Sequence, residues 1–333
     1  MAERSDGPSS PRNPLSRAWG AVWDPTPASM RLLALLGVIG NAGIIATGGA
    51  VRVTKSGLGC PEWPKCTGDS LVPTAHPEHS AVNMAIEFGN RMLTFLVLAV
   101  GVAVFVAALR LRPRRRDLVV LAAAQPASVF AQAIIGGIVV LTELHPASVS
   151  LHFLISPVLL IFCVALWVRA GEGDEPPRAL VGRGVRRLTL ALVGVSAALM
   201  VAGTVVTGTG PHAGDADSRR WGFNIEDVAR VHSAFAWLTV GLTVVLLVVL
   251  QRTGAPSALR RRAMELFVLE LSQGVIGYIQ YFTGAPATLV VLHMLGSAIM
   301  WIAALRVVLA TRDRGPLVTA RPEPAQARAA QPA

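Results

Sequence analysis

The sequence predicts an all-α membrane protein of eight transmembrane helices, arranged as two tandem four-helix bundles. Hydrophobic residues make up 53% of the 333 residues and charged residues only 15%, whereas a soluble globular chain is about a quarter charged. Apolar runs of roughly twenty residues recur along the chain, which is the length needed to cross a hydrocarbon core of about 30 Å. In addition, one stretch of the sequence occurs twice.

The repeated stretch is residues 132–152, which return without a gap as residues 273–293. The identical pairs are Gln132 and Gln273, Ile135 and Ile276, Gly136 and Gly277, Ile138 and Ile279, Thr142 and Thr283, Val149 and Val290, Leu151 and Leu292, and His152 and His293. Each copy predicts the end of one helix, a tight turn and the start of the next helix, with the histidine just inside it. Units of four spans enter the membrane in the same direction, so we expect a pseudo-twofold axis along the membrane normal.

The expected spans follow the apolar runs in chain order. They are residues 30–53, 82–109, 117–140, 147–169, 186–208, 227–250, 263–283 and 287–311. The first run is too long for the core of a signal peptide, and we expect it to be retained. The domains are therefore an N-terminal bundle (30–170), a cytoplasmic linker (171–185) and a C-terminal bundle (186–311). The polar, proline-rich tails, residues 1–29 and 312–333, are expected to be disordered.

Arginines are concentrated in alternate loops and in both tails. The loop arginines of this set are Arg110, Arg112, Arg114, Arg115, Arg116, Arg178, Arg183, Arg186, Arg187, Arg252, Arg260, Arg261 and Arg262. Because basic residues favour the cytoplasmic side, we expect a cell-membrane protein with both termini in the cytoplasm. The same distribution explains the net charge of +10, so the expected environment is membrane lipid and no nucleic-acid partner is predicted.

Four residues at matched positions begin the even-numbered spans: Asn90, His152, His232 and His293. All lie about 8–12 Å inside the membrane boundary, at about 1.5 Å per residue. Two histidines on facing helices at one depth are typical of axial haem ligation in a helical bundle. The alternative is that each histidine is hydrogen-bonded within the core. The repetition and the shared depth favour ligation of a haem iron by these histidines.

The second span carries a charged pair, Glu87 and Arg91. An ionised side chain inside a membrane helix costs a few kcal/mol, and residues four apart share a helix face and can pair. One alternative is a structural ion pair alone. The other is a carboxylate at the reacting edge of a haem, with Arg91 holding that carboxylate or a propionate. Arg230, two residues before His232, is either a propionate partner or an interfacial arginine.

Two cysteines, Cys60 and Cys66, lie close together in the first outward-facing loop. Cysteines on the oxidising side of a membrane form disulfides, and we expect one here. The sequence leaves open whether it is a structural staple or a redox-active pair. Cys163 lies in an apolar run, where a small core residue is the simplest interpretation.

Several motifs together resemble one known family. They are Val51-Arg52-Val53-Thr54, the loop from Ser56 to Pro61 with Trp63-Pro64 and Cys66, the run from Ile86 to Arg91, Leu151-His152, Arg230-Val231-His232 and Leu292-His293. Over residues 30–311 the chain resembles haem A synthases. The resemblance implies tandem four-helix bundles and oxidation of the C8 methyl group of haem O to a formyl group. Successive hydroxylations, with water as the oxygen source, would supply the cofactor of cytochrome c oxidase.

The resemblance also implies roles for single residues. His232 and His293 would ligate the iron of a haem b cofactor, and His152 would ligate the iron of the substrate, haem O. Glu87 would be the essential catalytic carboxylate, and the Cys60–Cys66 disulfide would be linked to activity. Many members have histidine at the position of Asn90, and an amide is a poor iron ligand, so a two-histidine site is not expected in the N-terminal half.

Partners follow from the same resemblance. We expect contact with haem O synthase, because the substrate is insoluble, and a role in cytochrome c oxidase assembly. A homo-oligomer and the electron acceptor are left open by the sequence. Two other functions also remain open: a bis-histidine haem b electron carrier, and a transporter built from parallel repeats. A scaffold protein is a further alternative.

Overall fold

The computed structural model describes residues 23–74 and 80–317. This part of the chain forms eight long helices and two short strands. In order they are α2 (Pro27–Val53), α3 (Ala81–Arg110), α4 (Arg116–Leu141), α5 (Pro146–Ala170), β1 (Arg178–Ala179), α6 (Arg183–Thr209), α7 (Ile225–Arg252), α8 (Ser257–Phe282), α9 (Ala287–Leu309) and β2 (Arg312–Asp313). All eight expected spans are helical in the described residues. Seven of these helices are long and apolar enough to cross a membrane, so the chain is a multi-pass membrane protein.

Helix α8 is the exception among the eight. It is 26 residues long, as long as its neighbours, but it is less apolar. Its polar residues include Arg260, Arg261, Arg262, Glu265, Glu270 and Gln273. This helix is less apolar than the other seven because its first turns and its buried face carry polar and ionisable side chains. Two of those side chains, Glu270 and Gln273, are buried within the protein.

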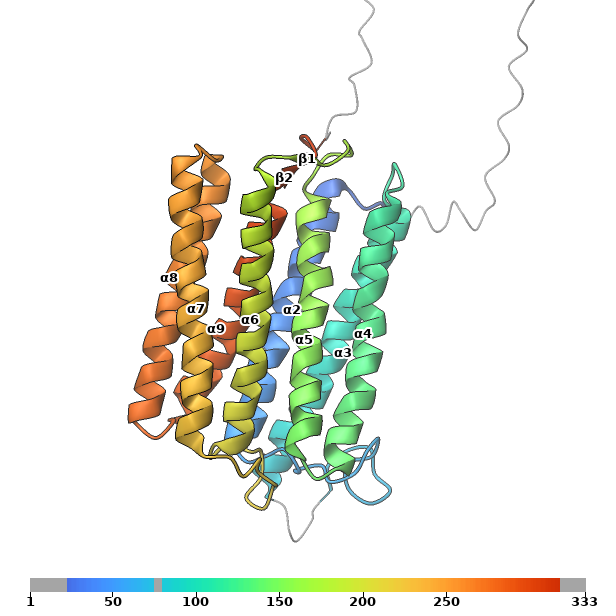
Figure 1. Ribbon diagram of the computed structural model, residues 1–333. Coiled ribbons are helices and arrows are strands. Elements are labelled where there is room, and N and C mark those ends of the chain that lie inside the picture. Colours follow the sequence, from blue (N-terminus) through green and yellow to red (C-terminus); the bar gives the residue numbers. More distant parts are fainter. Residues whose placement is uncertain (1–22, 75–79, 318–333) are drawn as a thin grey trace, which may run out of the picture.

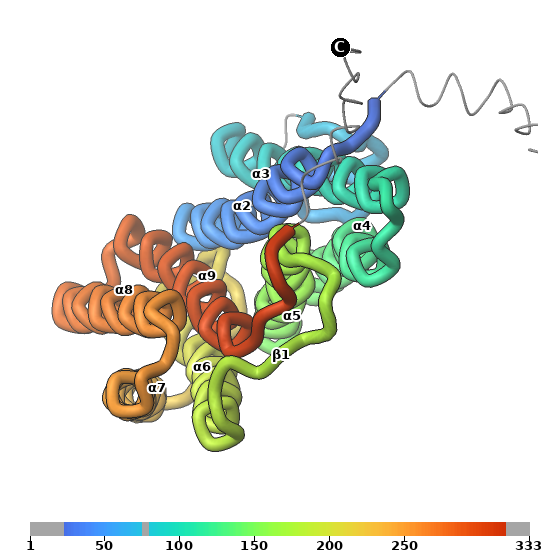
Figure 2. Tube along the Cα trace, turned by 90° about the horizontal axis from the view of Figure 1, so that it is seen from above, coloured from blue at the N-terminus to red at the C-terminus, as the bar shows by residue number. Residues whose placement is uncertain are grey.

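The helices close into two rings (Figure 1, Figure 2). In the first half α2 contacts α3 and α5, and α4 contacts both α3 and α5; in the second half α6, α7, α8 and α9 make the corresponding contacts. Between the halves, α9 packs against α2 and α5, and α5 also packs against α6. A core cluster that includes Val38, Leu160 and Trp301 fills this junction. There, Trp301 Nε1 donates a hydrogen bond to the Pro157 carbonyl at 2.9 Å.

The ends of the expected domains need small corrections. Helix α2 begins at Pro27, inside the expected tail of residues 1–29, because Thr26 and Ser29 form a reciprocal capping box and proline suits the first helical turn. Residues 1–22 lie outside the described residues. At the other end, β2 pairs antiparallel with β1, so both the linker and the start of the expected tail 312–333 contain ordered structure. Residues 318–333 also lie outside the described part.

The two ends of the bundle differ. One end, here named the linker end, carries β1, β2 and the turn between α3 and α4 (Figure 1). Here Arg169 pairs with Asp117 and Asp174, and Arg115 also pairs with Asp174. The opposite end, here named the disulfide end, carries the loop of residues 54–74, which we name the disulfide loop. The loop between α6 and α7 lies at the same end.

Candidate functional site

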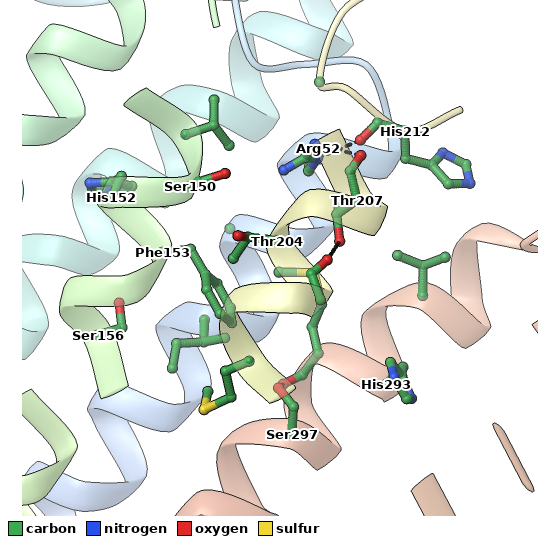
Figure 3. Close-up of a pocket in the computed structure, with 18 of the residues that line it drawn as sticks. Arg52, Ser150, His152, Phe153, Ser156, Thr204, Thr207, His212, His293 and Ser297 are labelled. Carbon is green, nitrogen blue, oxygen red and sulfur yellow. Dashed lines mark hydrogen bonds between the residues drawn. The ribbon is translucent and has the colours of Figure 1, made fainter. Parts of the chain in front are cut away.

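A cavity of about 2290 Å³ lies among the helices, and residues of the two loops at the disulfide end contribute to its lining (Figure 3). Pockets for small organic ligands usually enclose about 300–1,000 Å³, so this space suits a larger ligand or two ligands. Its lining comes from both halves. The sequence-predicted site residues that line it are Glu87, Asn90, Arg91, His152, Arg230, His232 and His293. Cys60 and Cys66 do not line it; they are buried in the loop that covers Glu87.

His232 of α7 and His293 of α9 lie together in the second half. Their ring centroids are 6.4 Å apart and the rings are inclined at 74°. His232 Nδ1 lies 3.2 Å from the Leu199 carbonyl. As a donor to that carbonyl, Nδ1 leaves the lone pair of Nε2 free, which is how ligating histidines are commonly oriented.

This pair fits an iron atom between the two rings. Metal–nitrogen bonds of about 2 Å on each side place two such rings roughly 6 Å apart. His293 Nδ1 is buried and has no hydrogen-bond partner among the described residues, which is unusual for a polar atom in a protein interior. The geometry is therefore compatible with a haem held by both imidazoles.

His152, His232 and His293 each lie against a glycine of a neighbouring helix. A Cβ at Gly203 would lie 3.2 Å from His232 Cε1, one at Gly136 would lie 3.3 Å from His152 Cε1, and one at Gly277 would lie 3.6 Å from His293 Cε1. The absence of a side chain at these positions lets each imidazole lie close to the adjacent backbone. The glycines of the repeat, Gly136 and Gly277, thus have the same task in both copies.

Among the described residues of the N-terminal half, His152 is the one histidine that lines the cavity. His152 Nδ1 is buried without a hydrogen-bond partner in the described part of the chain. Asn90, at the matching position of α3, instead accepts a hydrogen bond from Thr47 through its amide oxygen at 2.8 Å. The structure therefore engages Asn90 in a helix–helix contact, and His152 remains the imidazole available in this half.

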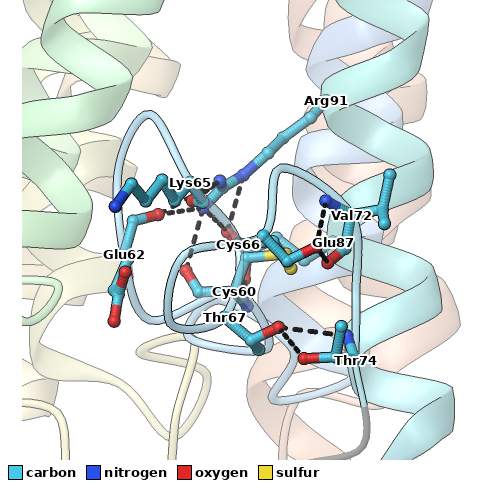
Figure 4. The surroundings of a disulfide bond; sticks show 10 residues. Cys60, Glu62, Lys65, Cys66, Thr67, Val72, Thr74, Glu87 and Arg91 are labelled. Carbon is cyan, nitrogen blue, oxygen red and sulfur yellow. Dashed lines mark hydrogen bonds and ion pairs between the residues drawn. A yellow bond between two sulfur atoms is a disulfide. The ribbon is translucent and has the colours of Figure 1, made fainter.

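Glu87 of α3 is 6% exposed and lies under the disulfide loop (Figure 4). The Cys60 amide donates to Glu87 Oε2 at 2.6 Å, and Arg91 Nη2 lies 2.7 Å from Oε1. The predicted pairing of Glu87 with Arg91 is thus confirmed. Both carboxylate oxygens have donors, so the Cys60 amide and Arg91 hold this carboxylate in place.

Arg91 also fixes the disulfide loop. Its guanidinium donates to the carbonyls of Cys60, Glu62 and Lys65 at 2.9–3.2 Å. The predicted disulfide between Cys60 and Cys66 is present. The disulfide closes the loop on itself, and hydrogen bonds to Glu87 and Arg91 hold the loop to α3.

The disulfide loop also covers the N-terminal part of the cavity. Trp63 lines the cavity, and its indole lies so close to α4 that a Cβ at Gly137 would be 2.5 Å from the ring. Pro64 lines the cavity beside it. Neither residue was predicted to line a site, although both belong to the loop motif.

Arg230 is not the buried, unpaired arginine that a propionate partner requires. Its side chain is 72% exposed and pairs with Glu226 at 3.2 Å and with Asp227 at 3.1 Å. Its charge is therefore already balanced on α7.

Arg52, named above only as part of a motif, also lines the cavity. Arg52 Nε donates to the His212 carbonyl, and Nη2 donates to the Thr207 carbonyl at 3.0 Å.

Comparison with known proteins shows the family to which the chain belongs. A family model described as cytochrome oxidase assembly protein, COX15-CtaA, matches residues 31–305. The chain belongs to this family. A relative in Halalkalibacterium halodurans, named heme A synthase, is 29% identical over 185 residues, which are 54% of this chain and 60% of the relative. A heme A synthase of Exiguobacterium is 30% identical over 163 residues, which are 47% of this chain and 50% of the relative.

Another relative carries a different name. A protein of Thermus thermophilus named protoheme IX farnesyltransferase is 28% identical over 294 residues. These residues are 83% of this chain but 47% of the relative. The chain thus spans about half to three-fifths of the length of the curated relatives it matches. Family membership rests on the family model, which covers most of the helical region.

Proposed function

We propose that this protein is a haem A synthase, which oxidises the C8 methyl group of haem O to a formyl group with water as the oxygen source. The observation that carries the proposal is the cavity itself. It combines a histidine pair with iron-ligating geometry, a separate single histidine and a buried, bonded carboxylate. Membership of the COX15-CtaA family and the names of the two bacterial relatives support it.

In this proposal the two halves have different tasks. His232 and His293 hold a haem b cofactor, which supplies one-electron redox chemistry. His152 holds the iron of the substrate haem O in the N-terminal half. Asn90 is hydrogen-bonded to Thr47, which supports a single protein ligand for the substrate iron. His232 is oriented by the Leu199 carbonyl, which supports two protein ligands for the cofactor iron.

Glu87 is the proposed catalytic carboxylate. The methyl group loses electrons, which the haem b held by His232 and His293 would relay to a separate electron acceptor. The Glu87 carboxylate stabilises the positive charge that develops beside it or accepts the proton that leaves. The hydrogen bonds from Cys60 and Arg91 hold the carboxylate in one orientation before the reaction. Trp63 and Pro64 of the disulfide loop line this part of the cavity.

We further propose eight spans with a pseudo-twofold relation, in the cell membrane, with both termini in the cytoplasm. The corresponding helix contacts in the two rings support the relation, as does the repeat. The Thermus relative, named protoheme IX farnesyltransferase, supports a partner that makes haem O. Cytochrome c oxidase assembly is the proposed destination of the product, in keeping with the family description.

The test is to co-express the chain with a source of haem O and to identify the extracted haems as pyridine haemochromes. Haem A is the expected product, and the Glu87→Gln variant is expected to retain bound haem without forming haem A. Haem b alone, from wild-type protein supplied with haem O, would instead support a bis-histidine electron carrier. That alternative accounts for His232 and His293 but leaves the carboxylate under the loop without a task.

A further inference from the structure

The cavity holds more positive charge than its helices neutralise. Three basic side chains other than histidine line it among the described residues: Arg52, Arg91 and Arg230. Arg91 is paired with Glu87, and Arg230 is paired with Glu226 and Asp227. Arg91 and Arg230 are also the two arginines that the sequence predicted as candidate propionate partners. Their guanidinium groups are already occupied by acids of their own helices.

Arg52 differs from the other two. Its partners are neutral carbonyls, those of Thr207 and His212, and no carboxylate of a described residue lies within ion-pair distance. Its Nη1 atom has no hydrogen-bond partner in the part of the chain that the structure describes. The neighbouring Arg220 adds positive charge rather than balancing it. An uncompensated guanidinium in a largely desolvated position calls for an anion.

The position of Arg52 makes it accessible to a ligand in the cavity. It belongs to the last turn of α2, where the carbonyl end of the helix favours a cation. Its two carbonyl partners lie in α6 and in the loop that follows α6, so the side chain crosses from the first half to the second (Figure 3). The carbonyl contacts fix the guanidinium plane while leaving Nη1 for another acceptor. Guanidinium groups held in this way bind carboxylates well.

We propose that Arg52, positioned by the carbonyls of Thr207 and His212, binds a propionate carboxylate of a porphyrin in the cavity. This inference rests on the proposed function, because a porphyrin is the ligand assumed. It adds a residue that anchors the ligand by its acidic edge, independently of the iron ligands. The porphyrin beside His152 and the one between His232 and His293 both carry such carboxylates, and the experiment separates them.

The experiment compares two ligands on the full chain purified without haem. One ligand is iron protoporphyrin IX, with two free propionates, and the other is its dimethyl ester, in which both are neutral. Loss of a charge-assisted hydrogen bond costs about tenfold or more in affinity. We therefore expect the wild-type chain to bind the diacid at least about tenfold more tightly than the diester. We expect Arg52→Gln to remove most of this preference by weakening diacid binding alone.

Two further variants control for folding and for general charge. Arg52→Lys keeps the charge but not the fork of donors, and should retain part of the preference. Arg219→Gln removes a positive charge from an exposed position of the same loop region outside the cavity lining, and should keep the whole preference. Since the acid-to-ester ratio is measured within each variant, partial loss of folded protein does not mimic the effect.

The variants His152→Ala and His232→Ala show which of the two porphyrins supplies the carboxylate that binds Arg52. If the preference and its dependence on Arg52 persist in the first background, the carboxylate belongs to the porphyrin of the C-terminal half. If they persist only in the second, it belongs to the porphyrin beside His152. Equal binding of diacid and diester by the wild-type chain would overturn the inference and leave the proposed function standing. A preference that survives Arg52→Gln unchanged would also overturn it. Failure of the wild-type chain to bind either ligand would overturn both.

Discussion

The imidazole rings of His232 and His293 lie 6.4 Å apart, centre to centre, although they come from different helices and are separated by 61 positions in the numbering. One of them is oriented by a backbone carbonyl and the other has a buried nitrogen without a partner among the described residues. The pair is therefore pre-arranged for a shared ligand.

Replacing His232 by alanine removes one member of this pair. We expect the purified His232→Ala protein to lose the low-spin haem spectrum of the C-terminal half, because a six-coordinate iron needs both imidazoles. Helix content, measured by circular dichroism, should remain unchanged. The control is His145→Ala, which alters a histidine at the start of α5 outside the cavity lining. An unaltered low-spin spectrum in His232→Ala would contradict the assignment.

The glycine behind His232 provides a more subtle test. A Cβ at Gly203 would be 3.2 Å from His232 Cε1, whereas one at Gly194, in the same helix, would meet nothing within 4 Å. Overpacking costs about 1–3 kcal/mol, so Gly203→Ala should weaken haem binding by about tenfold. Gly194→Ala should bind haem as the wild type does. A haem titration followed by absorption gives both values, and equal affinities in the two variants would be evidence against this packing.

The carboxylate of Glu87 has a structural and a proposed chemical task, which a conservative variant separates. Glu87→Gln keeps a side chain that can accept the Cys60 hydrogen bond but leaves Arg91 without its charge partner. We expect loss of haem A formation, retention of bound haem, and a loss of stability of about 1–3 kcal/mol. Product is measured by haem extraction and stability by thermal unfolding in detergent. Asp217→Asn, at an exposed acid of the loop between α6 and α7 outside the cavity lining, is the control and should form haem A normally.

The disulfide should behave as a structural staple. Both sulfur-bearing residues, Cys60 and Cys66, have no exposed surface, and thiol–disulfide exchange requires access of the attacking thiolate. We therefore expect the native protein to resist mild reductant, with both cysteines labelled by a thiol reagent only after denaturation. Mass spectrometry of the labelled protein measures this. Rapid labelling of Cys60 and Cys66 in the folded protein after mild reduction would favour the redox-active alternative.

The sequence was sufficient for the features that depend on local spacing. Hydrophobic run lengths predicted the helices to within a few residues, and the spacing of four residues predicted the pairing of Glu87 with Arg91. The matched depth of the residues that begin the even-numbered spans predicted that His232 and His293 could face each other within one half. These features share one property: the signal lies within one or two helices.

Contacts between distant segments could not be predicted in the same way. Arg52 donates to backbone carbonyls of residues 155 and 160 positions further along the chain. Every residue has a backbone carbonyl, so the residue types at these positions do not predict the contact. The Cys60 amide that binds Glu87 has the same property. The polar character of α8 was visible in its residues, but burial of Glu270 against Thr243 depends on the packing of α7 and α8.

The strand pair at the linker end bears on the transporter alternative. Alternating access requires the two halves to rock against each other, and the segment that joins them must then have free length. Here that segment is fastened to the residues after α9: the Gly173 amide donates to Gly315, the Leu180 amide donates to Thr311, and Arg178 pairs with Asp313. A rocking motion that moves the linker would have to break these bonds on every cycle, so the tether favours a stationary cofactor site over a moving gate.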